Sequence, residues 1–190
     1  MAREFSRKDN LTKETLLALA RAGCFIIAAT SPYFLTNFLQ AYFNDKMKQA
    51  CWKRAERLRE LEKKRIVSFQ ELADGKIKIE LTQRGQSWIR CYQLEDLEIN
   101  KPKKWDRKWR LIFYDIPEYN KKARDALSKK LRNLGLYQLQ KSLWVSAYDC
   151  LPEIEFCCAV FNIDMNNHIF YLEIQTVPKE KEIKKWFNLA

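Results

Sequence analysis

Residues 105–118 decide the fold of the second half of this chain, and they read WDRKWRLIFYDIPE. A basic, tryptophan-rich approach leads into a short apolar run of strand length, and Asp115 stands at its end. A positively charged helical segment follows, and then residues 135–144 read GLYQLQKSLW. The second stretch predicts a short polar bend between two strands.

The second half of the chain alternates strand and helix signals. We expect a strand at 110–116, a helix at about 119–134, a strand pair at about 137–148, a helix at about 152–161 and a strand at 168–175. This β-α-β-β-α-β order is the ferredoxin-like plan. The tail, residues 178–190, is charged and then apolar at Trp186-Phe187, which predicts a last helix docked on its own domain or on a partner subunit.

The first half predicts three helices and a hairpin. The helices are expected at 12–28, 32–43 and about 46–64, and Asp74-Gly75 then separates two alternating runs at 66–71 and 76–81. Three helices followed by a hairpin is the winged helix-turn-helix plan, with the third helix in the recognition position. We therefore expect an α+β protein with a winged helix-turn-helix domain at 1–98, a basic linker at 99–109 and a ferredoxin-like dimerisation domain at 110–190.

Positive charge is unevenly distributed along the chain. The formal net charge of the 190 residues is +11, but residues 111–190 hold 11 Lys and Arg against 10 Asp and Glu. Residues 99–110 hold six against one, and residues 46–65 hold nine against three. Such clustering is typical of proteins that bind phosphate backbones. A role in solubility explains the total charge better than it explains the clustering.

The third helix and the hairpin carry the candidate DNA contacts. Base reading is expected from the early turns of the helix, and phosphate contacts from its later turns and from the hairpin. The candidate DNA-binding residues are Lys48, Gln49, Trp52, Lys53, Arg57, Arg59, Lys63, Lys76 and Lys78. The alternative is a solvated helix in a winged domain that binds protein, because a fold alone does not determine function.

Neither a zinc cluster nor a secretory signal is indicated. The six cysteines lack CxxC spacing and His168 is the only histidine, so we expect no cofactor and reduced thiols that pack as small apolar residues. Residues 22–43 are apolar but are interrupted by Ser31-Pro32, Asn37 and Gln40, which argues against a membrane span. We expect a cytoplasmic protein with no membrane partner, although the sequence leaves a monotopic contact open.

The two stretches quoted first resemble the PaaX family, bacterial regulators related to a phenylacetate-catabolism repressor, and in particular their central domain. That domain is itself similar to the small CRISPR-associated "Cas-two" subunit. The resemblance is close over about residues 101–175. It implies a transcriptional regulator that binds double-stranded DNA as a homodimer. Family members carry a further C-terminal region tied to effector response, whereas this sequence ends at Ala190. We therefore expect no acyl-CoA control, and the effector is unknown.

The same resemblance offers a competing function at Asp115. In the CRISPR subunit, an acidic residue at this strand end is paired across a dimer and implicated in metal-dependent nuclease chemistry. Asp115 is thus the candidate catalytic and metal-binding residue of a nuclease or CRISPR-adaptation-like subunit, with Glu118 as a possible helper. One carboxylate per chain is few for metal catalysis. The other interpretation is that Asp115 accepts hydrogen bonds from backbone or arginine donors, and we expect a regulator and not an enzyme.

Two tryptophans in the basic approach also have two interpretations. Trp105 and Trp109 lie beside Arg107, Lys108 and Arg110, and mixtures of aromatic and basic side chains stack on bases in single-strand binders. A tryptophan in a linker more often pins two domains together. We expect packing.

Overall fold

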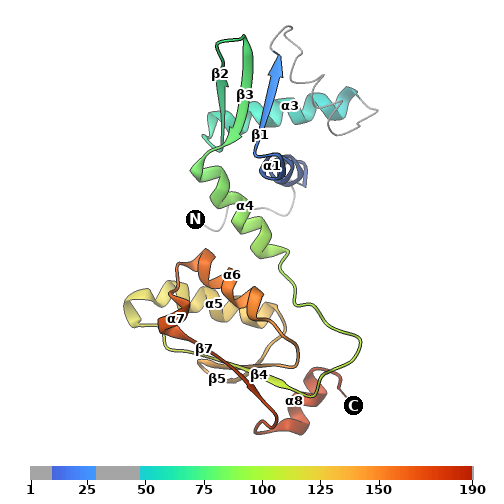
Figure 1. The fold of residues 1–190 in the computed structure, drawn as a ribbon, viewed down its shortest axis with the longest axis vertical. Helices are drawn as coiled ribbons and strands as arrows, with labels where there is room; N and C mark the ends of the chain where they lie inside the picture. Colours follow the sequence, from blue (N-terminus) through green and yellow to red (C-terminus); the bar gives the residue numbers. More distant parts are fainter. Residues whose placement is uncertain (1–9, 29–47, 190) are drawn as a thin grey trace. The chain divides into compact units, whose positions relative to one another are not determined.

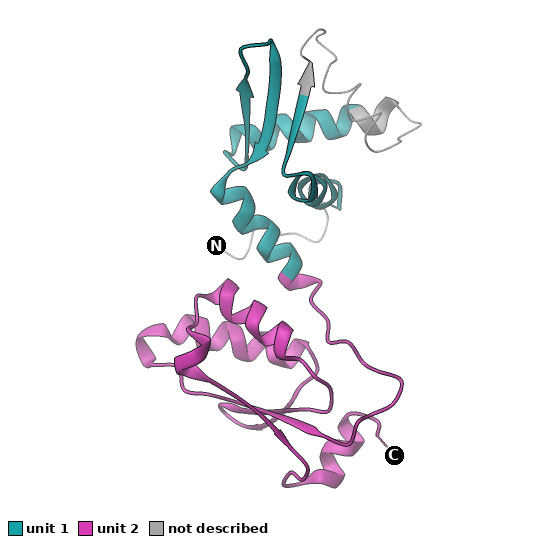
Figure 2. Ribbon diagram, viewed as in Figure 1, with its two compact units in different colours: residues 1–93 teal, residues 94–190 magenta. Residues whose placement is uncertain are grey.

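The computed structural model describes residues 10–28 and 48–189. It is a mixed α+β structure with two antiparallel sheets, and the chain divides into two compact units, Met1–Gln93 and Leu94–Ala190 (Figures 1 and 2). The linker expected at 99–109 contains neither helix nor strand over 99–108, but Trp109 begins a strand, and the whole segment belongs to the second unit.

The first unit combines helices with a three-stranded sheet. Its described elements are α1 (Asn10–Ala22), β1 (Cys24–Ala28), α3 (Lys48–Lys63), β2 (Val67–Glu71), β3 (Lys76–Leu81) and α4 (Gln83–Glu95). The strand order is β1-β3-β2, and both pairings are antiparallel. Leu16 and Leu19 of α1, Leu58 of α3 and Ile79 of β3 are fully buried and form the centre of the core.

The first helix is shorter than the sequence predicts, and a strand replaces the last five residues of the predicted helix. The helix ends at Ala22, Gly23 follows with a φ of 77°, and residues 24–28 pair with β3. Phe25 is 4% exposed whereas Ile26 is 55% exposed, which is the two-residue period of a strand. The prediction was wrong because apolar residues at 24–28 also satisfy a helical pattern when no sheet edge is considered. The helix expected at 32–43 lies outside the described residues.

The hairpin is confirmed, and hydrogen bonds of Thr82 then connect the end of α3 to the start of α4. Gly75 has a φ of 73°, as the turn requires. After β3, the backbone N–H of Thr82 donates to the carbonyl oxygen of Ile66 at 3.1 Å, and its hydroxyl donates to that of Arg65 at 2.7 Å. The same hydroxyl accepts from the backbone N–H of Gly85, so it caps α4 while it holds the end of α3.

The second unit is built on a four-stranded sheet. Its elements are β4 (Trp109–Tyr114), the 3-10 turn η1 (Glu118–Asn120), α5 (Lys121–Asn133), β5 (Tyr137–Gln140), β6 (Leu143–Ser146), α6 (Leu151–Phe161), α7 (Met165–His168), β7 (Ile169–Ile174) and α8 (Glu180–Trp186). The strand order is β5-β6-β4-β7, and every neighbouring pair is antiparallel.

Each face of this sheet has its own hydrophobic cluster. On one face, Ile112 and Trp144 pack with residues of α5 and α6, among which Leu127, Leu131 and Ile154 are fully buried. On the other face, Trp109 and Val145 pack with Ile183 of α8. Figure 1 shows α5 and α6 on one side of the sheet and α8 on the other. The tail helix therefore docks on its own unit, which is the first of the two alternatives that the sequence left open.

The cysteines of α6 are part of the core. Cys157 and Cys158 are free and buried, and burial raises the pKa of the Cys157 thiol to about 12 and that of Cys158 to about 11. These thiols stay protonated at neutral pH and pack as small apolar groups.

Candidate nucleic-acid interface

The outer face of α3 is the exposed cationic surface of the first unit. The inner face of α3 is buried and carries Arg54, Ala55, Leu58 and Leu61. On the opposite side, the exposed residues Trp52, Glu56, Arg59 and Lys63 follow one another at helical spacing of four, three and four. We call these four residues the outer stripe. The Trp52 side chain is 58% exposed, which is unusual for so large an apolar group.

The predicted contacts on α3 differ in their electrostatic environment. Lys53, Arg59 and Lys63 are exposed and form no ion pair within residues 10–28 and 48–189. Arg57, in contrast, is paired with Glu60. Lys48 and Gln49 lie in the first turn of α3, but their side chains are outside the described part of the structure.

Both lysines of the hairpin are already paired with carboxylates. Lys76 binds Asp74, and Lys78 binds Glu80. The Glu80 hydrogen bond raises the pKa of Lys78, and the Lys76 hydrogen bond lowers the pKa of Asp74. These side chains are about half or one-third exposed, so exchanging a carboxylate for another anion is energetically inexpensive.

Three further exposed cations, which are not among the predicted DNA contacts, lie just after α3 and at the start of α4. Lys64, Arg65 and Arg84 are exposed and form no ion pair among the described residues. The junction through Thr82 brings the chain at Arg65 close to the start of α4. The run Lys63-Lys64-Arg65 was visible in the sequence, but its proximity to Arg84 depends on contacts between distant residues.

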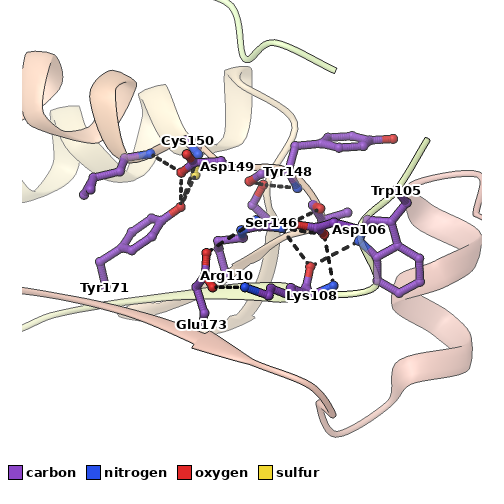
Figure 3. Close-up of polar contacts among 12 residues, drawn as sticks. Trp105, Asp106, Lys108, Arg110, Ser146, Tyr148, Asp149, Cys150, Tyr171 and Glu173 are labelled. Carbon is purple, nitrogen blue, oxygen red and sulfur yellow. Dashed lines mark hydrogen bonds and ion pairs between the residues drawn. The ribbon is translucent and has the colours of Figure 1, made fainter. Parts of the chain in front are cut away.

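In the second unit, a buried arginine joins the basic approach to the sheet. Arg110 is 5% exposed, and its guanidinium donates to Asp106 at 2.9 Å and to Glu173 of β7 at 3.4 Å (Figure 3). It also donates to the carbonyl oxygen of Lys108 at 3.0 Å, while Lys108 itself reaches Glu173 at 2.8 Å. Arg110 is therefore a structural cation that fixes residues 106–110 against β7.

This network makes a pH-dependent contribution to stability. The Arg110 hydrogen bond lowers the pKa of the Asp106 carboxyl below its usual 3.8. A group whose pKa is lowered in the folded state stabilises that state above the unfolded pKa. The contribution is therefore present at neutral pH and is lost as the pH falls below 3.8 and through the lowered pKa.

The two tryptophans of the approach pack, as expected, and the contacts that follow are made within the second unit. Trp109 is fully buried, with its ring centroid 4.7 Å from that of Trp105 and 6.2 Å from that of Phe187. The Trp105 indole N–H donates to the carbonyl oxygen of Lys108 at 3.1 Å. Trp109 is thus unavailable for stacking on a base. The basic approach, the sheet and the C-terminal tail therefore pack together in the second unit.

Residues 102–184 match the family model of the PaaX protein central Cas2-like domain. The match begins within the basic approach and ends in α8, so this part of the chain is similar to the central domain of PaaX proteins. The first unit lies outside the matched residues. No curated protein matches the chain. Within the described ranges, every helix is too short or too polar to cross a membrane.

In the PaaX-like unit, Asp115 is exposed where β4 ends. Its backbone N–H donates to the carbonyl oxygen of His168 at 2.9 Å, but within the described residues its carboxylate has neither a hydrogen bond nor an ion pair. Glu118 is held by Arg124 at 2.9 Å, which lowers the pKa of Glu118. Across residues 10–28 and 48–189, no group of three or more His, Cys, Asp or Glu side chains is arranged to hold a metal ion.

Proposed function

We propose that this protein is a transcriptional regulator of PaaX type that binds double-stranded DNA sequence-specifically and acts in the cytoplasm. The observation that carries the proposal is the exposed cationic outer face of α3, which lies in the same unit as the lysine-bearing β2–β3 hairpin. The match of residues 102–184 to a regulator family supports it independently.

The two units support the proposed architecture by their topology. In the first unit, α1, β1 and α3 are followed by the β2–β3 hairpin, and β1 pairs with β3. This arrangement fits a winged helix-turn-helix domain. In the second unit, the order β5-β6-β4-β7 with α5 and α6 on one face fits the ferredoxin-like plan.

In the proposed complex, α3 enters the major groove and the hairpin lies along the neighbouring backbone. Lys53 and Arg57 are expected to contact phosphates beside the groove, and Lys76 and Lys78 those beside the hairpin. The two hairpin lysines exchange Asp74 and Glu80 for phosphate oxygens. The basic face of α3 gives the initial attraction, because Lys53 and Arg59 are exposed and have no partner among the described residues.

DNA binding should weaken steeply with salt. Each phosphate contact contributes about −0.9 to the slope of log affinity against log salt concentration. Replacing both Lys76 and Lys78 by alanine should flatten that slope by up to about two units, measured by fluorescence anisotropy on a labelled duplex. The matched control is Lys121→Ala with Lys122→Ala, a pair of exposed lysines on α5. An unchanged slope in the hairpin variant would remove the hairpin from the interface.

We further propose that the protein acts as a homodimer formed through β7 and the adjacent sheet face. β7 is an edge strand of sequence IFYLEI, without the lysine or proline that commonly blocks edge pairing. Its residues Phe170 and Leu172 are 50% and 53% exposed, and Phe113 of β4 lies beside Phe170 with a ring distance of 5.7 Å. A two-fold pair would place two copies of α3 on two half-sites of a near-palindromic operator.

Light scattering at high micromolar concentration should therefore report twice the chain mass of 22.8 kDa. Leu172→Glu should convert the protein to a monomer, because it places a charge in the apolar contact. Tyr119→Glu is the control, since Tyr119 is 88% exposed and lies outside this patch. A wild-type monomer, with or without DNA, contradicts the proposed dimer.

The competing function is a metal-dependent nuclease that uses Asp115. The exposed carboxylate at the end of β4 is the observation in its favour. On the regulator proposal, purified protein with Mg²⁺ or Mn²⁺ should cut neither DNA nor RNA, and Asp115→Asn should leave duplex affinity nearly unchanged. Gel assays over hours check this. Metal-dependent cleavage that disappears in Asp115→Asn, which keeps the shape but loses the charge that binds metal, would establish the nuclease instead.

A further inference from the structure

Glu56 is an exposed acidic residue that lies between basic residues on the outer face of α3. It lies on the outer stripe, four residues after Trp52 and three before Arg59, and its side chain is exposed. The stripe from Trp52 to Lys63 is about 16 Å long at about 1.5 Å per residue, compared with a major groove about 12 Å wide. A helix that lies in the groove along this stripe would therefore place Glu56 over base edges.

The ion pairs of the unit leave Glu56 out. Glu14, Glu60, Asp74 and Glu80 are each paired with a lysine or arginine. Glu56 has neither an ion pair nor a hydrogen bond within the described residues, although Lys53 and Arg59 lie three positions away on either side. Glu56 therefore does not neutralise a neighbouring cation in the described part of the structure.

An unpaired carboxylate is costly in a DNA groove unless it accepts a hydrogen bond. Phosphate oxygens repel it, and so do the base-edge acceptors of the major groove, which are guanine N7 and O6, adenine N7 and thymine O4. Adenine N6 is a donor, but it stands beside the acceptor N7 of the same base. The exocyclic amino group of cytosine, N4, is the donor that pairs well with glutamate. An acidic residue at this position would thus lower the affinity for most sequences and spare those with a correctly placed cytosine.

Resting on the proposed DNA binding, we propose that Glu56 is a specificity-determining residue that selects a cytosine in the operator by accepting a hydrogen bond from its N4 amino group. The surrounding lysines and arginines then attract DNA of any sequence. Glu56 discriminates between sequences because it weakens binding to those that lack the cytosine.

The test selects binding sites from a random duplex library with the full-length protein and with two variants. Glu56→Gln removes the charge and keeps the shape. Glu62→Gln is the matched control, because Glu62 is also an exposed α3 glutamate without an ion pair among the described residues but lies off the outer stripe. Affinities for the selected duplex and for the same duplex with the cytosine replaced are then measured at one salt concentration.

The wild type should fix a cytosine and bind the selected duplex about 5- to 150-fold more tightly than the substituted one. Glu56→Gln should lose most of that ratio and bind the substituted duplex more tightly than the wild type does, whereas Glu62→Gln should keep the ratio. A Glu56→Gln variant that selects the same cytosine with the same ratio overturns this inference and leaves the proposed function standing. A wild type that enriches no sequence overturns both.

Discussion

Replacing Trp109 by alanine should lower the free energy of unfolding of the second unit by about 3–5 kcal/mol. Trp109 is fully buried between Trp105, Phe187 and the residues of α8, and truncation leaves a large cavity that these neighbours can fill only in part. Urea denaturation followed by far-UV circular dichroism measures the change.

Two further variants make the Trp109 result specific. Trp109→Phe should cost clearly less, because it fills much of the cavity and removes an indole N–H that is buried without a hydrogen-bond partner among the described residues. Tyr119→Ala, at a residue that is 88% exposed, should change stability by no more than about 0.5 kcal/mol. A Trp109→Ala protein as stable as the wild type would mean that α8 does not pack on this residue.

Gly85→Ala should destabilise the first unit, by roughly 1–3 kcal/mol. Alanine in place of glycine normally stabilises a helix by about 1 kcal/mol. Here the added Cβ would lie 2.1 Å from the carbonyl oxygen of Ile66, a backbone atom that Thr82 also holds. The backbone must shift, and the junction between α3 and α4 loosens.

The matched control for this prediction is Gln86→Ala at the next, exposed position of α4, which should be close to neutral. Urea denaturation of both variants, with the transition moved by Trp109→Ala as a reference for the other unit, assigns the loss to the first unit. Gly85→Ala should also weaken duplex binding, because α3 is held at this junction. A stabilised Gly85→Ala protein would show that the close approach to Ile66 is absent.

The sequence was sufficient to predict local structure but not the contacts between residues that are distant along the chain. The hairpin at Asp74-Gly75 follows from alternation and turn chemistry, and the buried positions Leu127 and Leu131 follow from helical spacing. β1 was missed because its assignment depends on pairing with β3, about fifty residues away. Gly23 before it, with φ above zero, was the available signal.

The candidate site shows the same limit. The exposed cations of α3 could be predicted from the spacing of its apolar residues, but the sequence treats every basic residue alike. It could not show that Arg110 is committed to Asp106 and Glu173, because Glu173 lies 63 residues away. Nor could it show that Glu56 forms no ion pair in the described structure, since ion pairing depends on the three-dimensional positions of the neighbouring side chains.

The position of α8 has a consequence for how large an assembly of this chain can grow. A sheet with two open edges can add copies without limit and form a filament. Here the β5 edge is obstructed, since Tyr137 binds Glu182 at 2.6 Å and packs against Trp186, and a bulge interrupts β5 between Gln138 and Gln140. Of the two edges of this sheet, β7 is the one we propose for pairing, so the proposed association would close after two copies.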